Sequence, residues 1–431
     1  MIYKFIFIFF LLILSFQVLL SKNRTKNAFD FLVAGRSLSY FGVSGVIIGT
    51  LVGGASTIGT VQMAYFYGLA GIIFTLGSGI ACLILGFFLS KKLYEANIVT
   101  ITEFLGQTFG ARFRKVSSVF STLGIYVHVV AQIIASGAII SQFFNTTIMI
   151  GSLISSLLIL IYSIFGGVKS SSVIGKLKIF VIYFVMLICF VIAFKNGKFD
   201  IVEKLKLEID PSIKWLSIFS YGFKSGFMDI LFMIIGVLST QVYLQAVFSA
   251  KSKKNAMLGC ILSGVLIPPV GLFGVYIGMY VRSTGFNANG GADVLPYFIN
   301  SNFHPMLSAI FLAFILFIIL GTASGLVVGV VTNIFNDFFI TAKKGLLSLN
   351  EKKEMYIVRL VNFTVVFTGY FIVAIGIQSK ILKWSYLSMG IRGGAVFLPL
   401  ISVLYFKDRI DLKKYEFLFY LMFLLIIYYM I

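Results

Sequence analysis

Long apolar segments alternate with short polar ones along the whole chain. A helix needs about 20 apolar residues to cross the hydrocarbon core of a bilayer. Twelve segments approach or exceed that length, and the pattern predicts a helix in each of them: 2–20, 41–66, 70–90, 117–143, 147–165, 173–194, 216–248, 256–281, 305–335, 356–377, 381–406 and 415–431. We call the first the leading helix, the next ten core helices one to ten, and the last the trailing helix.

This pattern divides the chain into three parts and defines an all-α polytopic membrane protein. Residues 1–40 hold the leading helix and a polar loop, 41–406 form the ten-helix core, and 407–431 contain the trailing helix. The polar segments between the spans are short, so no separate soluble domain is expected.

Composition supports this class and excludes others. Of 431 residues, 59% are hydrophobic and 12% charged, against about 25% charged in soluble proteins. The net charge of +20 is spread over short loops, so it does not form the single basic face of a nucleic-acid-binding protein. We expect the lipid bilayer as surroundings, no nucleic acid, and no obligate protein partner.

The lysines and arginines predict how the helices are oriented. Most of the 35 Lys and Arg fall in alternate loops, and cytoplasmic loops retain such residues. The N-terminus is therefore expected outside, with loops 91–116 and 341–355 cytoplasmic and 195–214 external. The expected location is the plasma membrane of a bacterium. No catalytic motif or metal cluster is visible, so neither an enzyme nor an organic cofactor is expected.

Core helix one is rich in small residues at mid-membrane, where Gly49–Thr60 reads GTLVGGASTIGT. Close packing between helices is one interpretation. The other is a broken helix, because transporters expose unwound backbone near the midplane to a cation or an anionic group. Core helix eight has a similar patch, Gly321–Gly325 (GTASG). Hydroxyl and carbonyl oxygens of this kind suit a monovalent cation.

Six motifs, in order, resemble the sodium/solute symporter family, which includes sodium/galactose and sodium/proline symporters. The resemblance extends over about residues 29–410. The motifs are Phe31–Ser37, Gly54–Gly59 with Ala64–Gly68, Thr100–Leu105 with Phe109–Gly110, Tyr162–Gly167, Gln241–Gln245 with Phe248–Lys251, and Gly321–Gly325 with Asn336–Phe339.

The resemblance implies a LeuT-like fold of two inverted five-helix repeats, 41–194 and 216–406, with core helices one and six broken. It also implies a sodium site between core helices one and eight. Matched by position, backbone carbonyls would come from Ala55, Ile58 and Ile318, and hydroxyls from positions 321 and 322.

This chain departs from the family at three positions near that site. Thr322 keeps its hydroxyl, whereas Gly321 stands where the family usually has Ser. In core helix five the family's Asp is replaced by Gly175 and its Gln by Lys178. We therefore expect at most one coupling sodium, and we expect Gly321→Ser to raise sodium affinity.

Several polar residues inside the spans are candidates for solute binding. A charge at mid-membrane costs about 2.5–3.5 kcal/mol on insertion scales, so Arg392 and Asp229 stand out. Arg392 suits a solute carboxylate, or else a gate or packing ion pair, or a side chain that snorkels to the interface. Asp229 would bind an ammonium or proton, or pair with Arg392 or Lys224. His128 and Gln132 share a helix face and serve solute binding or inter-helix bonding. Gln62 and Tyr65 follow the expected break.

These observations favour a cation-coupled symporter, with sodium the expected ion, that imports a small organic solute by alternating access. Three alternatives remain. The chain would be a sensor or regulatory protein that has lost transport, a proton-coupled symporter, or a channel, although no charged rings or filter sequence are visible.

Overall fold

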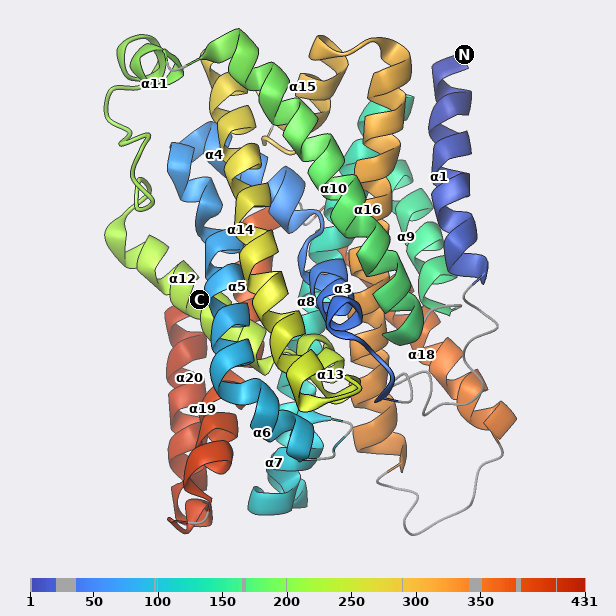
Figure 1. The fold of residues 1–431 in the computed structure, drawn as a ribbon, viewed down its shortest axis with the longest axis vertical. Coiled ribbons are helices and arrows are strands. Elements are labelled where there is room, and N and C mark those ends of the chain that lie inside the picture. Colours follow the sequence, from blue (N-terminus) through green and yellow to red (C-terminus); the bar gives the residue numbers. More distant parts are fainter. Residues whose placement is uncertain are drawn as a thin grey trace.

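The chain folds into a bundle of helices that run mostly along its long axis (Figure 1). The structure, a computed structural model, describes residues 2–20, 36–96, 98, 100–164, 168–198, 200–288, 290–340, 351–376, 381–407 and 409–430. Parts of two family-like motifs, Phe31–Gly35 and Phe165–Gly167, and most of loop 341–355 lie outside these residues.

Each predicted apolar span contains one helix or two to three consecutive helical segments. In chain order they are α1 (Ile2–Leu20), α3 (Tyr40–Leu51) with η3 (Ala55–Gly59) and α4 (Thr60–Tyr67), α5 (Ile73–Ile84) with η5 (Leu85–Leu89) and α6 (Ser90–Glu95), α8 (Ala111–Phe144), α9 (Ile148–Ile164), α10 (Val168–Gly197), α12 (Phe223–Ser239) with α13 (Gln241–Phe248), α14 (Lys253–Ser283), α16 (Pro305–Ile334), α18 (Glu351–Ala374), α19 (Ile381–Phe406) and α20 (Glu416–Met430).

Short elements connect these helices: η4 (Gly68–Ile72), α7 (Ile101–Phe109), α11 (Ile201–Lys204), η6 (Leu205–Ile209), α15 (Val294–Asn302), η7 (Phe335–Ile340) and η8 (Leu412–Tyr415). Within the described residues, seven helical segments are by themselves long and apolar enough to cross a membrane, or eight if α12 and α13 form one span. The count of twelve spans therefore stays a prediction.

Two of the spans contain a break: core helices one and six. Each of them is the first helix of one of the two predicted repeats. The first core helix stops at Leu51 and resumes as a π-turn at Ala55. The sixth is divided at Thr240, where α12 and α13 meet at an angle of 42°. The structure therefore confirms the expected breaks in core helices one and six.

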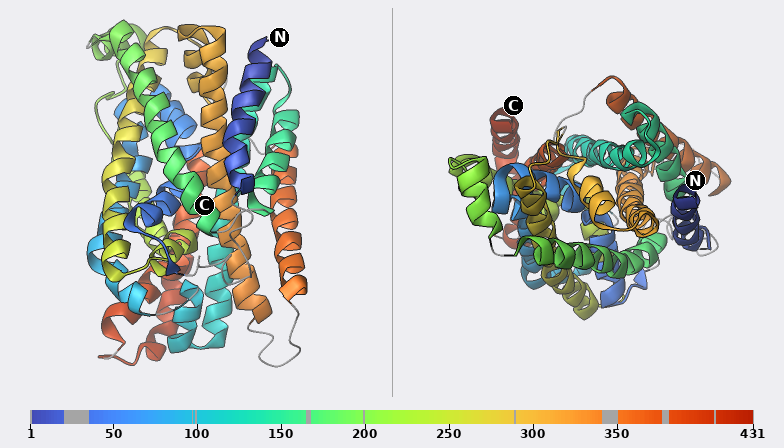
Figure 2. Two further views of the ribbon diagram at one scale, coloured as in Figure 1. Left: turned by 45° about the vertical axis from the view of Figure 1, so that its right-hand side comes forward. Right: turned by 90° about the horizontal axis from the view of Figure 1, so that it is seen from above.

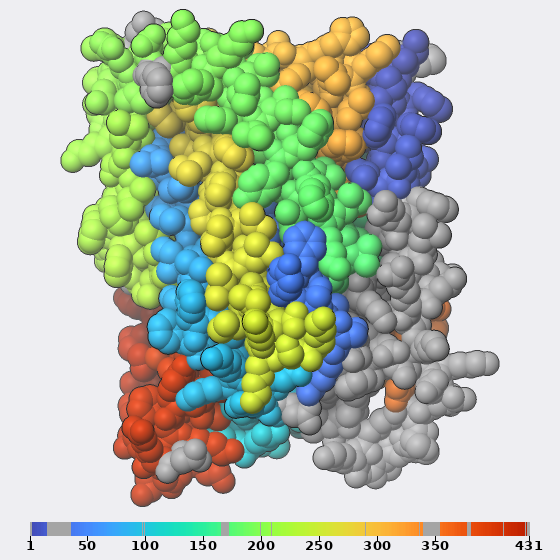
Figure 3. Space-filling view, viewed as in Figure 1, coloured from blue at the N-terminus to red at the C-terminus, as the bar shows by residue number. Residues whose placement is uncertain are grey.

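Helices α10 and α14 pack along α3 from two sides, and on the face shown in Figure 3 only a small part of α3 is visible between them. The contact with α10 is very close. A Cβ atom at Gly175 would lie 1.7 Å from the carbonyl oxygen of Gly45, so this position accepts only glycine. The family's aspartate would not fit here without moving the two helices apart.

The leading and trailing helices lie at the edge of the bundle. Viewed from above, α1 and α20 are on opposite sides of the core helices (Figure 2). Helix α1 packs on α16, and α20 packs on α19. Neither helix contributes to the site described below.

The two ends of the bundle provide a test of the predicted orientation. In Figure 1, α11 lies at the upper end with the N-terminus, and α7 lies at the lower end. The cysteine variants Glu203→Cys and Gln107→Cys place an exposed thiol at each end. An impermeant maleimide added to intact cells should label position 203 and spare position 107. Native Cys82, Cys189 and Cys260 are buried, so the background should be low. Labelling of position 107 from outside would reverse the topology.

Candidate functional site

The break in the first core helix is held by a side chain of the same segment. Ser56 accepts a hydrogen bond from the backbone N–H of Gly53 at 3.2 Å. The same hydroxyl donates to the carbonyl of Leu51 at 3.1 Å. A break inside an apolar bundle is tolerated only when such freed backbone groups find partners, and Ser56 supplies two of them.

Neighbouring helices supply the other partners. The side-chain oxygen of Gln132, on α8, accepts the backbone N–H of Gly54 at 2.8 Å. The hydroxyl of Thr322, on α16, lies 2.9 Å from the carbonyl oxygen of Val52. A Cβ atom at Gly53 would lie 2.5 Å from Thr322 Oγ1. The small residues therefore serve both predicted purposes, close packing and unwinding.

A lysine from a third helix, α10, also bonds to the broken segment. Lys178 Nζ, on α10, donates to the carbonyl of Gly49 at 2.6 Å and to Thr322 Oγ1 at 2.6 Å. Only 1% of the residue is exposed. Lys178 lies within the predicted span 173–194, and the tight contact of α10 on α3 carries its side chain into the bundle.

Only some of the residues that the resemblance assigns to sodium contact or approach Lys178. Thr322 contacts it directly, and a Cβ atom at Gly321 would lie 3.1 Å from Lys178 Cδ. The carbonyl of Ile318 is 3.3 Å from Thr322 Oγ1. The carbonyl of Ala55 accepts bonds from the backbone and hydroxyl of Thr60. Ile58 is fully buried in the same π-turn.

A second buried cluster lies one helical turn along α8 from the break. Arg392, on α19, donates to the carbonyl and the hydroxyl of Ser388 at 3.2 and 2.7 Å. Its Nη2 lies 3.1 Å from His128 Nδ1. His128 and Gln132 are four residues apart, so α8 links this cluster to the Gln132–Gly54 bond. Both Arg392 and His128 are fully buried.

Three polar atoms of this cluster have no hydrogen bond of full geometry to any residue that the structure describes. They are Arg392 Nη1, His128 Nε2 and the hydroxyl oxygen of Tyr243. Tyr243, on α13, lies beside Arg392, close enough for a weak hydrogen bond between the two side chains. Buried polar groups without partners are costly, so these atoms mark a position suited to a polar ligand.

Asp229 does not belong to this cluster. Its carboxylate accepts a hydrogen bond from Tyr221 at 2.6 Å, and Tyr221 lies in the segment that leads into α12. The guanidinium of Arg392 bonds to Ser388 and His128 instead. The structure therefore does not support the hypothesis that Asp229 neutralises Arg392.

Gln62 and Tyr65 point towards the loop that precedes α15. Gln62 donates to the carbonyl of Gly290 and accepts from the backbone of Ile381. Tyr65 donates to the carbonyl of Phe286 and accepts from Arg282 at 3.0 Å. These contacts tie α4 to the loop at the upper end of the bundle, above the break.

One polar centre at the lower end was missed by sequence reasoning. The carboxylate of Asp337, in η7, accepts from Arg114 at 2.9 Å and from the hydroxyls of Thr100 and Thr102. It is fully buried. Two of the family-like motifs meet here, the Thr100–Leu105 and Asn336–Phe339 motifs. The sequence signal that could have predicted this contact is the acidic residue of the second motif, which can accept hydrogen bonds from the hydroxyls of the first.

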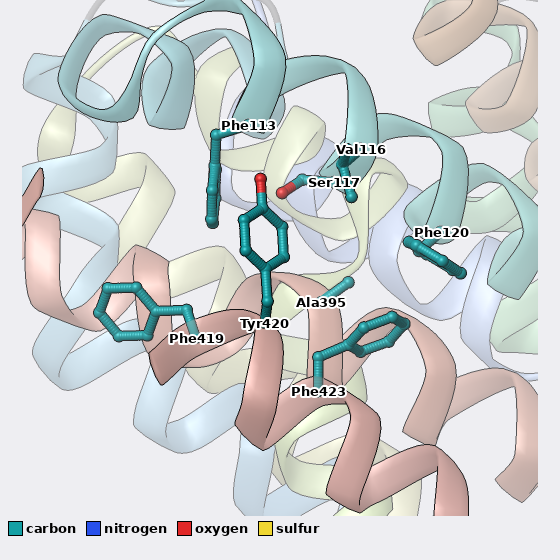
Figure 4. Close-up of a pocket in the computed structure, with 8 residues that line it drawn as sticks. All are labelled: Phe113, Val116, Ser117, Phe120, Ala395, Phe419, Tyr420 and Phe423. Atoms are coloured by element: carbon teal, nitrogen blue, oxygen red, sulfur yellow. The ribbon is translucent and has the colours of Figure 1, made fainter. Parts of the chain in front are cut away.

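A small cavity of about 10 Å³ lies elsewhere, between α8 and α20 (Figure 4). Its wall is mostly aromatic, with Phe113, Phe120, Phe419, Tyr420 and Phe423 among the lining residues. None of the residues at the break or around Arg392 lines it. We therefore assign it no part in the site.

Two broken helices at mid-bundle, with polar side chains from three other helices converging on the first break, are typical of secondary transporters. The chain belongs to the sodium:solute symporter family, whose model matches residues 31–412. This agrees with the six motifs. The protein is accordingly a multi-pass membrane protein of a transporter family.

Solved structures support the fold. A Na⁺-coupled sialic acid symporter in an outward-open state aligns with a TM-score of 0.79 at 16% identity, covering 99% of this chain and 96% of that one. MhsT in complex with L-phenylalanine aligns with a TM-score of 0.61 at 12% identity, covering 92% and 99%. These similarities confirm the LeuT-like fold.

Curated relatives match over shorter regions. A high-affinity choline transporter of Drosophila melanogaster is 25% identical over 65% of this chain and 46% of its own length. A sodium/glucose cotransporter of Vibrio parahaemolyticus is 27% identical over 35% of this chain and 28% of its own length. The chain thus matches half or less of the length of these relatives.

The bond from Gln132 to the break leads to a testable prediction. Gln132→Ala leaves the N–H of Gly54 without its acceptor, which costs about 1–3 kcal/mol. We expect the purified protein to melt at a lower temperature and to bind solute more weakly. Gln142→Ala is the control, because it removes a partly exposed glutamine from the same helix. Equal melting temperatures for the two variants would contradict a role of Gln132 at the break.

Proposed function

We propose that this chain is a cation-coupled secondary symporter that imports a small organic solute across the bacterial plasma membrane by alternating access. The observation that carries the proposal is the break in core helix one. Its freed backbone groups are held by side chains from α8, α10 and α16. Such a break places polar groups from several helices at one point in the bundle, as transport requires. Membership of the sodium:solute symporter family supports sodium as the coupling ion.

We further propose that the solute carries a carboxylate and binds at Arg392. A guanidinium holds a carboxylate through two parallel hydrogen bonds. Nη1 of Arg392 has no partner at full hydrogen-bonding geometry among the described residues, and only Tyr243 lies close to this guanidinium without such a bond. His128 Nε2 and Tyr243 supply further polar atoms nearby. A relative named as a choline transporter would carry a cation. An arginine that has no carboxylate partner among the described residues disfavours a cation at this position.

The sequence-based assignment of six substrate-binding residues is thereby narrowed. Arg392 and His128 stay candidates for direct contact, and Gln132 is proposed to hold the break. We propose that Gln62 and Tyr65 fix the upper loop over the site, because both bond to it. Asp229, on α12, pairs separately with Tyr221, which lies in the segment just before this helix.

The test has two stages. A thermal-shift screen of the purified protein over small metabolites identifies a ligand, because ligand binding stabilises the folded state. Uptake of that ligand is then measured in proteoliposomes with and without an inward cation gradient. Gradient-driven accumulation is the expected result. Binding without any accumulation would instead favour a sensor or regulatory protein on the same fold.

A further inference from the structure

We infer that the side-chain ammonium of Lys178 occupies the cation position between α3 and α16, in place of the sodium ion that family resemblance assigns there. The consequence for coupling rests on the proposed transport function. The occupancy of the cation position by Lys178 does not depend on transport, and it is tested on purified protein.

The contacts of Lys178 are those expected of a bound cation. Its Nζ atom lies 2.6 Å from the carbonyl oxygen of Gly49 and 2.6 Å from the hydroxyl of Thr322. Thr322 is one of the residues assigned to sodium, and it also bridges to Val52 at 2.9 Å. A sodium ion that used these oxygen atoms would have to displace the lysine.

The surroundings favour a positive charge at this point. Gly49 lies in the last turn of α3, where the unpaired carbonyls give the helix a partial negative charge. Half-helix ends of this kind bind cations in other transporters. A lysine ammonium is a compact point charge with three donors, so it can satisfy the same oxygens as a free monovalent ion.

The three departures from the family pattern fit together around this lysine. A Cβ atom at Gly321 would lie 3.1 Å from Lys178 Cδ, so a serine there would press on the lysine stem. Gly175 lets α10 approach α3 closely enough for Lys178 to reach Gly49, since a Cβ atom would lie 1.7 Å from Gly45. The positions of the lost hydroxyl, the lost carboxylate and the gained lysine thus lie together around the same point of the bundle.

A covalently attached cation cannot be released into the cytoplasm. The position between α3 and α16 therefore stays occupied without sodium, and it holds α10 and α16 to the break at any sodium concentration. Any sodium that drives transport binds at other residues. Gly321→Ser alone should accordingly fail to raise sodium affinity, which revises the expectation from family resemblance.

The test removes the lysine and restores the family hydroxyl. In Lys178→Ser with Gly321→Ser, the oxygens of Gly49 and Thr322 are freed and a serine hydroxyl is added. This double variant should bind radioactive sodium saturably, with no competition from potassium. Its melting temperature should rise by about 3 °C in sodium relative to potassium, at sodium about 100-fold above Kd. Adding Thr322→Ala should abolish both effects.

Wild type and two single variants complete the test. The control variant Lys176→Ser lies two residues away on α10. In wild type, in Gly321→Ser and in this control, adding Thr322→Ala should not reduce sodium binding. Sodium binding to wild type that Thr322→Ala abolishes would overturn the inference, as would a gain of sodium binding in Gly321→Ser alone. A folded double variant that binds no more sodium than wild type would also overturn it. None of these measurements needs transport, so a failure to accumulate solute would count only against the proposed function.

Discussion

Arg392→Lys should lower solute uptake by about 10- to 100-fold at subsaturating solute, while the protein stays folded and inserted. Lysine cannot reproduce the parallel donors of a guanidinium. It would lose the bonds to Ser388 and His128 that hold the side chain in place, and with them the orientation of Nη1. Each bond to a charged group contributes about 1.5–3 kcal/mol, and 1.4 kcal/mol corresponds to a factor of ten.

The matched control is Arg359→Lys, because Arg359 is exposed on α18. It should leave uptake unchanged. Solute affinity in Arg392→Lys should be measured by thermal shift as well as by uptake, so that a binding defect is separated from a defect in turnover. Unchanged affinity in Arg392→Gln would remove Arg392 from the site and would favour neutral solutes.

Asp337→Asn should be the most destabilising single change at the lower end of the bundle. It leaves the guanidinium of Arg114, whose side chain is only 17% exposed, facing a neutral amide. Breaking a buried pair by removing one partner costs about 3–5 kcal/mol. We expect a clearly lower melting temperature and reduced uptake, because Asp337 joins α16 to α7 and α8.

The chain offers a matched control for this prediction. Lys253 and Glu95 also form an ion pair, but the side chain of each is 54% exposed. Exposed pairs contribute about 0–1 kcal/mol, so Glu95→Gln should have little effect. Adding Arg114→Gln to Asp337→Asn should recover part of the lost stability, since no unpaired charge remains. A similar loss of stability from Glu95→Gln and Asp337→Asn would contradict this account.

Much of the architecture followed from the sequence. Apolar segments of spanning length have few alternatives to a helix, because a bilayer forces every backbone group to bond within its own segment. Each predicted span accordingly contains a helix. The break in core helix one was also readable, because Gly53, Gly54 and Ser56 combine backbone freedom with a hydroxyl that replaces lost helix bonds.

The partners of the buried polar groups could not be read in the same way. Asp229 and Arg392 were candidates for one ion pair, yet they bond to Tyr221 and to His128 with Ser388. Pairings between residues far apart in the chain depend on how helices rotate and cross, and hydrophobic periodicity does not specify this. Asp337 escaped notice for the same reason, because its partners lie more than 200 positions earlier.

Lys178 shows most directly what each level determined. The sequence by itself determined that a lysine replaces the family's glutamine in core helix five and that glycines stand at 175 and 321. Only the tertiary structure decided that these changes meet at one point. The physical reason is the contact between Gly175 and Gly45, which brings α10 against α3 closely enough for the lysine to reach Gly49 and Thr322.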